Sequence, residues 1–275
     1  MEFSSSVVTL EMKGHIATLW LDRPEARNAL GSAFWRDLPL AAATIESDPN
    51  VRVLVIAAKG PHFTVGLDLK EFGGDFLASD SESSAASSNA QSYESIRRLQ
   101  QAVTSIADLP FPVIAAVHGY CIGGGVDLIS ASDIRLASSD AVFSVREAKV
   151  AIVADLGTLQ RLPSIVSAGH VAELAFTGKD IDAQRALTIG LVNSLHGTSS
   201  DDVVEAAYEI ANEIAANSPL AVRGTKAVLA ANDGRSVAQG LDFVARWNTM
   251  YLHSNDLKEA MTAFLERRPS VFNGD

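Results

Sequence analysis

The stretch "CIGGGVDLISASDIRL", Cys121 to Leu136, places three consecutive glycines and an acid, Asp127, inside an otherwise apolar segment. Glycine costs about 1 kcal/mol per position in a helix interior, so a triplet needs a compensating reason. A buried carboxylate without a partner costs more. The preceding "PVIAAVHG" (112–119) has the pattern of a buried strand, so we expect a strand that turns through the glycines into a helix from Val126.

This glycine turn fits an anion-stabilising site better than a nucleotide cradle. No G-x-G-x-x-G follows the strand and no Gly-Lys-Ser/Thr follows the triplet, which disfavours a phosphate-binding loop. Bare backbone N–H groups at a helix N-terminus stabilise developing negative charge, and glycine lets a ligand approach them closely. Close helix packing is the alternative reason for the triplet, and the triplet alone does not separate the two.

A second turn of the same kind lies in "KGPHFTVGLDLKEF", Lys59 to Phe72. There a buried strand turns through Gly66 and a helix starts near Asp68. Two strand-to-helix turns with exposed amides are what an oxyanion hole for a thioester carbonyl requires. For Asp68 itself, a helix N-cap is the favoured interpretation.

Outward from these turns, the chain has the pattern of an α/β core. The alternation in "VVTLEM" and "HIATLWL" predicts an antiparallel pair with a turn at Lys13-Gly14. A helix over about 32–46 with Ser32 as its N-cap is expected to follow. Further buried strands are predicted at "RVLVIAA", "PVIAAVHG", "DIRLA" and "AVFSV".

The pattern changes near residue 200 and is helical from there to the end. We therefore expect a core over 1–200 with the active site and a helical oligomerisation region over 201–275. The Ser/Ala-rich stretch 78–92 has no apolar period, so we expect a surface loop there.

Composition limits the classes of function. The 275 residues are 47% hydrophobic, enough for a large core, and the formal charge of −11 argues against binding to nucleic acid or an anionic membrane. Cys121 is the only cysteine and the six histidines lack a metal-binding spacing, so we expect no disulfide and no metal. The N-terminus has no signal-peptide pattern and "VFNGD" is not a peroxisomal address, which favours a soluble cytoplasmic protein.

Several motifs in order resemble the enoyl-coenzyme A hydratase/isomerase (crotonase) superfamily over nearly the whole chain. They include "LDRPEARNAL", "FTVGLDL", "PVIAAVHGYCIGGGVDLISASDIRLAS", "FSVREAKVAIVADLGTLQRLP", "FTGKDIDAQRALTIGLVN", "SPLAVRGTK" and "AFLERRPSVF". The resemblance implies an α/β fold, a crotonase-like spiral of ββα units followed by C-terminal trimerisation helices, in a homotrimer or homohexamer. It also implies an acyl-coenzyme A substrate, with no cofactor besides the coenzyme A that is part of the substrate.

The resemblance also assigns binding residues. The backbone N–H groups of Leu67 and Gly124 would form the oxyanion hole. Residues beside them that would contact the substrate are Gly66, Asp68, Leu69 and Gly125. Arg27, and Arg267 or Arg268 from a neighbouring subunit, are candidates for binding the coenzyme A phosphates, although each could be an ordinary surface arginine.

Three acids distinguish activities within the superfamily. Hydratases that are similar elsewhere carry Glu at the positions of Asp127 and Glu147 and a small residue at that of Asp155. The set Asp127, Glu147 and Asp155 instead resembles the Δ3,5-Δ2,4-dienoyl-coenzyme A isomerases of fatty-acid β-oxidation. Converting a 3,5-diene to a 2,4-diene removes a proton from C2 and returns one at C6, so two separated carboxyls of opposite protonation state are required.

By placement, Glu147 would deprotonate C2, Asp155 would protonate C6 and Asp127 would orient the enolate formed between these steps. Asp155 could instead cap the helix "LGTLQRL", and Glu147 could pair with Arg146 or Lys149 on the surface. An enoyl-coenzyme A hydratase that uses Asp127 and Glu147, and a non-catalytic or RNA-binding homologue, are the alternative functions.

Two further residues near the glycines are expected to be structural rather than reactive. These are His118 and Cys121, because no neighbouring His or Asp is placed to activate the thiol.

Overall fold

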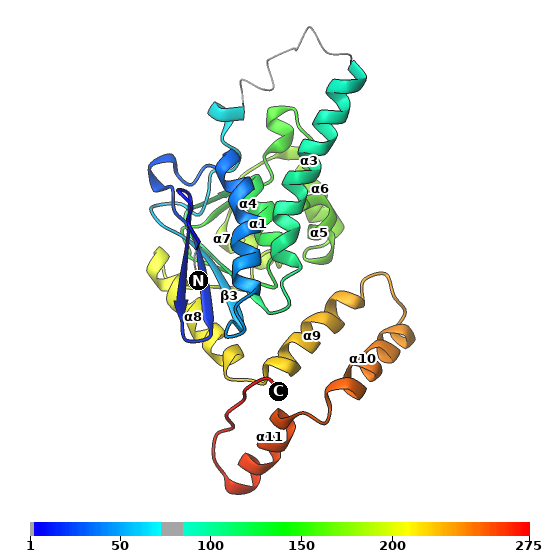
Figure 1. Cartoon of the computed structure of the whole chain (residues 1–275). Helices are drawn as coiled ribbons and strands as arrows, with labels where there is room; N and C mark the ends of the chain where they lie inside the picture. The colour runs from blue at the N-terminus through cyan, green and yellow to red at the C-terminus, as the bar shows by residue number, and fades with distance from the viewer. Residues whose placement is uncertain (1–2, 73–84) are drawn as a thin grey trace.

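A six-stranded sheet forms the centre of the molecule, seen in Figure 1. The computed structural model describes residues 3–72 and 85–275. The strands lie in the order β1-β2-β3-β4-β6-β9; β1 and β2 are antiparallel and the other neighbours are parallel. Their bounds are β1 Val8–Lys13, β2 Ile16–Leu21, β3 Val53–Ala58, β4 Val113–Val117, β6 Ile134–Ala137 and β9 Ser194–Leu195.

The predicted opening hairpin is present. Lys13 pairs with Ile16, so the turn lies at Gly14-His15, one residue later than expected. Gly14 has φ +61°, a left-handed conformation that glycine adopts without strain. The expectation of an antiparallel pair is confirmed, and only the turn position needed correction.

Both faces of the sheet are covered, which explains why β3 and β4 are continuously apolar. Side chains alternate along a strand, so Leu54 and Ile56 pack on one face and Val53 and Val55 on the other. The first face meets α1 (Ser32–Glu46), α3 (Ala85–Ala107) and α4 (Gly124–Ser130). The second meets α8 (Ser200–Ala215).

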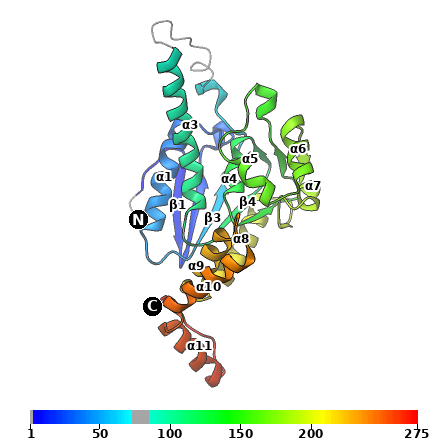
Figure 2. The same ribbon diagram turned by 90° about the vertical axis from the view of Figure 1, so that its right-hand side faces the viewer.

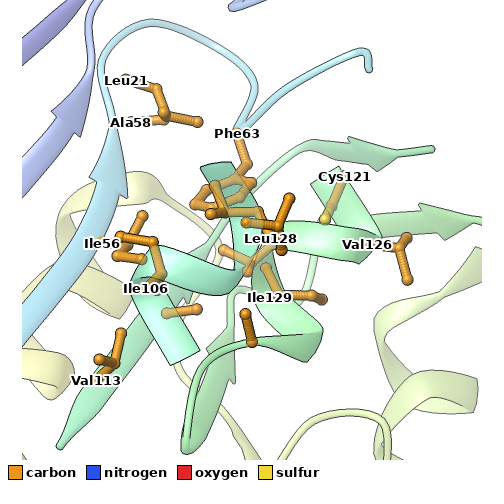
Figure 3. Close-up of a cluster of buried hydrophobic side chains, with 14 of the residues drawn as sticks. Leu21, Ile56, Ala58, Phe63, Ile106, Val113, Cys121, Val126, Leu128 and Ile129 are labelled. Atoms are coloured by element: carbon orange, nitrogen blue, oxygen red, sulfur yellow. The ribbon is translucent and has the colours of Figure 1, made fainter. Parts of the chain in front are cut away.

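The first face holds the larger of the two apolar clusters. Figure 3 shows members of it from β2, β3, α3, β4 and α4, among them Phe63, Ile106 and Leu128. Cys121 belongs to the same cluster and is fully buried, and burial raises the pKa of its thiol. The prediction that Cys121 is a core residue is therefore confirmed.

A small second sheet stands beside the main one. Its strands β5 (Tyr120–Ile122), β7 (Val142–Ser144) and β8 (Ile181–Asp182) lie in that order. Short helices join them to the rest of the core; Figure 2 shows several of them on one side of the molecule. They are η2 Glu147–Val150, α5 Thr158–Arg161, η3 Leu162–Ser164, α6 Ala168–Thr177 and α7 Ala183–Thr188; a further short helix, η1 Pro24–Ala26, lies between β2 and α1.

Three element boundaries differ from the sequence-based expectation. Gly31, not Ser32, is the N-cap of α1, and α4 starts at Gly124, not Val126. The stretch 85–92, expected to be part of a loop, is the start of α3, while 73–84 lies outside the described residues. Residues 86–92 of α3 are exposed and include no large apolar side chain, so they carry no apolar period; the helix continues outward from its packed end, because adding a turn to a helix is easier than starting one.

The C-terminal helices divide into two groups. The predicted boundary near residue 200 falls at the start of α8, and α8 packs on the sheet. Helices α9 (Pro219–Ala231), α10 (Val237–Tyr251) and α11 (Asn255–Glu266) project away from the core in Figure 1. Within the described residues, no helix is both long and apolar enough to cross a bilayer.

Candidate active site

A cavity of about 280 Å³ opens between the two glycine turns and α3. Residues of both turns and all three predicted acids line it. The lining residues are Trp35, Val65, Gly66, Leu67, Leu69, Ile96, Leu99, Ile122, Gly123, Gly124, Asp127, Arg146, Glu147, Val150, Ile152, Asp155 and Leu156. The walls are largely apolar, so the acids face a poorly solvated space.

Backbone hydrogen bonds hold the two turns side by side. The N–H of Thr64 donates to the carbonyl of Tyr120 at 2.8 Å, and the N–H of Ile122 donates to the carbonyl of Thr64 at 3.2 Å. Gly66 has φ +87°, and a Cβ there would stand 2.7 Å from the Ile122 carbonyl oxygen. Glycine is therefore required at position 66 for the turns to approach each other.

Two amides at these turns are free to bind an anion. Leu67 and Gly124 line the cavity, and neither backbone N–H donates to another group among residues 3–72 and 85–275. Gly124 is also the first residue of α4, where the helix leaves its N–H groups unpaired. The structure thus brings together the two groups that the resemblance assigns to an oxyanion hole.

Each glycine of the triplet has its own reason. Gly123 has φ +53°, and the Glu147 carboxyl lies against it. Gly124 faces the cavity, where a Cβ would stand 3.0 Å from the Leu30 side chain. Gly125 is buried, and a Cβ there would meet Thr64 Cγ2 at 2.5 Å. Both sequence interpretations hold, at different positions: Gly124 exposes an amide and Gly125 permits close packing, behind the cavity lining.

Asp127 is the most buried acid of the site. It lies in the first turn of α4, and its Oδ1 accepts the backbone N–H of Thr158 at 2.6 Å. Burial raises the pKa of Asp127 to about 6, and the negative charge of Asp155 adds to the rise, while the hydrogen bonds from Thr158 oppose it. Asp127 thus holds the start of α5 in place from another helix.

Glu147 lies at the start of η2 with an unmet acceptor. Its Oε2 is buried and has no hydrogen-bond partner in the described part of the chain. Burial raises the pKa of Glu147 to about 7, and the charges of Asp127 and Asp155 raise it further. Arg146 pairs with Asp180, so the alternative of an Arg146–Glu147 surface pair is not observed.

Asp155 comes from the irregular segment between η2 and α5. The N-cap of α5 is Gly157, without a side-chain capping bond, so Asp155 does not cap this helix. Burial raises the pKa of Asp155 as well. Burial therefore disfavours the state in which all three carboxyls of the cavity are charged.

Of the other predicted binding residues, Gly66 and Leu69 line the cavity. Asp68 caps the helical residues after it by accepting the N–H groups of Lys70 and Glu71. It also pairs with Arg23 at 2.8 Å, a hydrogen bond that lowers the pKa of Asp68. The N-cap interpretation of Asp68 is confirmed, and its charge is structural.

The candidate phosphate-binding arginines lie on two separate parts of the chain. Arg27 is exposed beside the Gly66 turn, where its carbonyl accepts the N–H of Val65. Arg268 follows α11, at the far end of the molecule in Figure 1, where it pairs with Glu259 and Glu266. Within one chain, therefore, Arg267 and Arg268 do not approach the cavity.

Several lining residues were not foreseen from the sequence. Trp35 comes from α1, Ile96 and Leu99 from α3, and Ile152 from the segment before Asp155. Each is an apolar residue of a kind that also packs in an ordinary core, so no local signal marks it as part of a site.

The position of His118 agrees with the structural role predicted for it. His118 is buried and its Nε2 contacts the Gly60 carbonyl at 2.9 Å, a position within the core. Among the residues that the structure describes, no group of three or more His, Cys, Asp or Glu side chains is arranged to hold a metal.

Comparisons with known proteins agree with this geometry. The family model for enoyl-CoA hydratase/isomerase matches residues 11–275. The chain is 44% identical to a peroxisomal Delta(3,5)-Delta(2,4)-dienoyl-CoA isomerase of Arabidopsis thaliana, over 92% of this chain and 91% of the relative. It is 40% identical to the mitochondrial enzyme of that name from Rattus norvegicus, over 98% and 81% of the two chains.

The fold is shared with solved structures too. The crystal structure of an enoyl-CoA hydratase from Bacillus anthracis superimposes with a TM-score of 0.89 at 29% identity, covering 98% of this chain and 100% of that one. The expected crotonase-type fold is confirmed. The chain belongs to the enoyl-CoA hydratase/isomerase family.

Proposed function

We propose that this protein is an isomerase that converts 3,5-dienoyl-CoA to 2,4-dienoyl-CoA. The observation that carries the proposal is the placement of Asp127, Glu147 and Asp155 in one cavity with the free amides of Leu67 and Gly124. Relatives at 40–44% identity that bear the name dienoyl-CoA isomerase support the same reaction.

The reaction balances as two proton transfers. Glu147 takes a proton from C2, and the electrons of the C2–H bond move into the thioester, which becomes an enolate conjugated with both double bonds, a trienolate. The N–H groups of Leu67 and Gly124 stabilise the negative oxygen. Asp155 then gives a proton to C6, the double bonds move to C2=C3 and C4=C5, and no atom is gained or lost.

The electrostatics of the cavity suit these roles. With a pKa of about 7, Glu147 is ionised in roughly half of the free enzyme at neutral pH, as a base must be. Burial raises the pKa of Asp155 in the direction that an acid needs. After each turnover Glu147 releases its proton to solvent, and Asp155 takes up a proton from solvent.

Asp127 is too deeply buried to exchange protons readily, and its Oδ1 is occupied by the Thr158 amide. In our proposal it orients the trienolate from the cavity lining and holds the start of α5, close to the segment that carries Asp155.

Hydration of an enoyl-CoA is the second candidate. It is favoured by the shared fold with structures titled enoyl-CoA hydratase, and it would use Asp127 and Glu147 on a water. That reaction has no role for Asp155, so Asp155 separates the two functions.

Assembly and location complete the proposal. Exposed apolar side chains on α9–α11, such as Leu229, Leu241 and Phe264, support a homotrimer or a hexamer built from two trimers. A coenzyme A thioester is the proposed ligand, with no nucleic acid or membrane partner. A cytoplasmic location stays a prediction from the sequence.

The test is ultraviolet spectroscopy of the purified protein with 3,5-dienoyl-CoA, combined with mass analysis of the product. An isomerase gives the conjugated 2,4-dienoyl thioester at unchanged mass. A product heavier by one water would establish the hydratase instead, and no reaction with either a 3,5-dienoyl-CoA or a 2-enoyl-CoA would refute both.

A further inference from the structure

The segment that carries Asp155 has no secondary structure of its own to hold it. Residues 152–155 are irregular, between the end of η2 and the start of α5. A proton-transfer group must nevertheless be held to a fraction of an ångström, because a displacement of about 1 Å can cost about a hundredfold in rate. Contacts from elsewhere in the fold must therefore fix this segment.

Helix α3 supplies one of them directly. The side-chain amide of Gln100 donates from Nε2 to the backbone carbonyl of Asp155 at 2.7 Å, across 55 positions of the sequence. Gln100 is half-buried on α3 and is not one of the cavity-lining residues. Its contact is with the main chain of Asp155, so it leaves the carboxyl free for the cavity.

A second contact lies one turn further along the same helix. Thr104 Oγ1 accepts from Arg161 Nη2 at 3.1 Å, while Nη1 of the same arginine donates to the Leu156 carbonyl at 3.3 Å. Residues four apart lie on one face of a helix, so Gln100 and Thr104 together hold two consecutive carbonyls against α3.

The position of Glu147 depends on other contacts. η2 is closed by its own backbone bonds: the N–H of Ile152 donates to the Glu147 carbonyl at 3.1 Å, and that of Lys149 to the Arg146 carbonyl at 3.0 Å. The bond from Gln100 thus reaches the main chain of Asp155 directly and does not contact Glu147.

We propose that Gln100 is a positioning residue for Asp155. Its bond to the main chain of Asp155 sets the Asp155 carboxyl against the cavity wall that Ile96 and Leu99 form on α3. The inference rests on the proposed isomerase function. Without the amide of Gln100, removal of the C2 proton continues, whereas delivery of the C6 proton slows.

The experiment measures the two half-reactions separately in heavy water. Gln100→Met keeps the length of the side chain and removes the donor. We expect exchange of the C2 proton and KM to stay within about twofold of wild type, while product formation falls between about tenfold and a hundredfold. Gln101→Met is the matched control, since Gln101 is the exposed neighbour on α3 and should leave both rates unchanged.

Gln100→Glu is the second variant. It keeps the shape of glutamine and presents oxygens where the amide donated, so it should lower the ratio of product formation to exchange as well. It decides the question if Gln100→Met does not fold. An unchanged ratio in a folded variant, or a parallel loss of exchange and product formation, would overturn the proposal. A wild-type protein that neither exchanges C2 protons nor forms product would instead refute the proposed function.

Discussion

The core behind the cavity and the projecting helices α9–α11 place their apolar side chains in opposite ways. In the core they are enclosed: Phe63, which precedes the Gly66 turn and lies beside α4 in Figure 3, is 0% exposed. On the projecting helices they face outward: Phe264 of α11 is 80% exposed and Leu229 of α9 is 68% exposed. The first region buries its apolar side chains within one chain. The second leaves apolar side chains exposed to solvent in a monomer.

This difference indicates that the reaction and the assembly of subunits depend on separate parts of the chain. The acids and the free amides all come from residues 67–155, on elements that pack against the main sheet or the small one beside it. The projecting helices contribute no lining residue to the cavity. Changes in the cavity should therefore alter proton transfer without altering assembly, and changes in α9–α11 should first alter assembly.

The largest expected effect comes from cutting between the two groups of C-terminal helices. A chain that ends at Asn217 keeps α8 and should fold with a cooperative transition, but as a monomer. A chain that ends at Ser199 loses α8 and exposes Ile16, Val53 and Val55, so it should aggregate. Light scattering and far-ultraviolet circular dichroism measure both outcomes. A trimer formed by the chain ending at Asn217 would contradict the comparison.

The next largest effect is expected at the acids. Glu147→Gln and Asp155→Asn should each lower turnover by about 10²–10⁴-fold, because each removes one proton-transfer group. Asp155→Asn should still exchange the C2 proton with heavy water and Glu147→Gln should not. Isomerisation by Asp155→Asn at the wild-type rate would leave Asp127 and Glu147 as the acting pair. Native mass measured by light scattering should be unchanged in both variants.

Gly124→Val tests the oxyanion hole. The new side chain would crowd Leu30 and Trp35 at the cavity and keep the thioester from the amide. Loss of one oxyanion donor costs about 10²–10³-fold in kcat. Gly169→Ala is the control, because a Cβ at position 169 meets nothing within 4 Å. Near-normal kcat in a folded Gly124→Val protein would remove Gly124 from the site.

The smallest expected effect is on pH dependence. The kcat/KM of the wild type should rise with pH around a midpoint near 7, as Glu147 ionises to act as a base. A fall in kcat/KM over the same range would instead assign Glu147 the role of the acid.

Stability should change in the opposite direction. Burial raises the pKa of Glu147 from 4.5 to about 7, so the neutral carboxyl is favoured in the folded state. The resulting stability is complete below pH 4.5 and is lost as pH rises through 7. The glutamine of the Glu147→Gln variant cannot ionise. The free energy of unfolding of this variant, measured by urea titration, should therefore rise by about 1–3 kcal/mol relative to that of the wild type between pH 5 and pH 8. An equal pH dependence in both proteins would show that Glu147 is not perturbed.

Much of the fold was predictable because its signals are local. Alternation in β1 and β2, continuous apolar runs in β3 and β4, and glycines at the two turns each reflect a constraint within a few residues. The start of α3 at Ala85 was not, because residues 86–92 of this helix are exposed, include no large apolar side chain and so show no period. A helix that continues from a packed end leaves no pattern of its own at the free end.

For the site, the sequence by itself determined which chemical groups are present: the glycine turns at Gly66 and Gly124, and the acids at 127, 147 and 155. Only the tertiary structure decided where they lie and which partners they meet. It made Asp127, not Asp155, the acceptor for the start of α5, and it brought Gln100 to the carbonyl of Asp155. These bonds join residues 31 and 55 positions apart, and their geometry depends on how helices pack across the sheet. A residue's type and its near neighbours fix what it can donate or accept, whereas the packing of distant segments fixes which partner it meets.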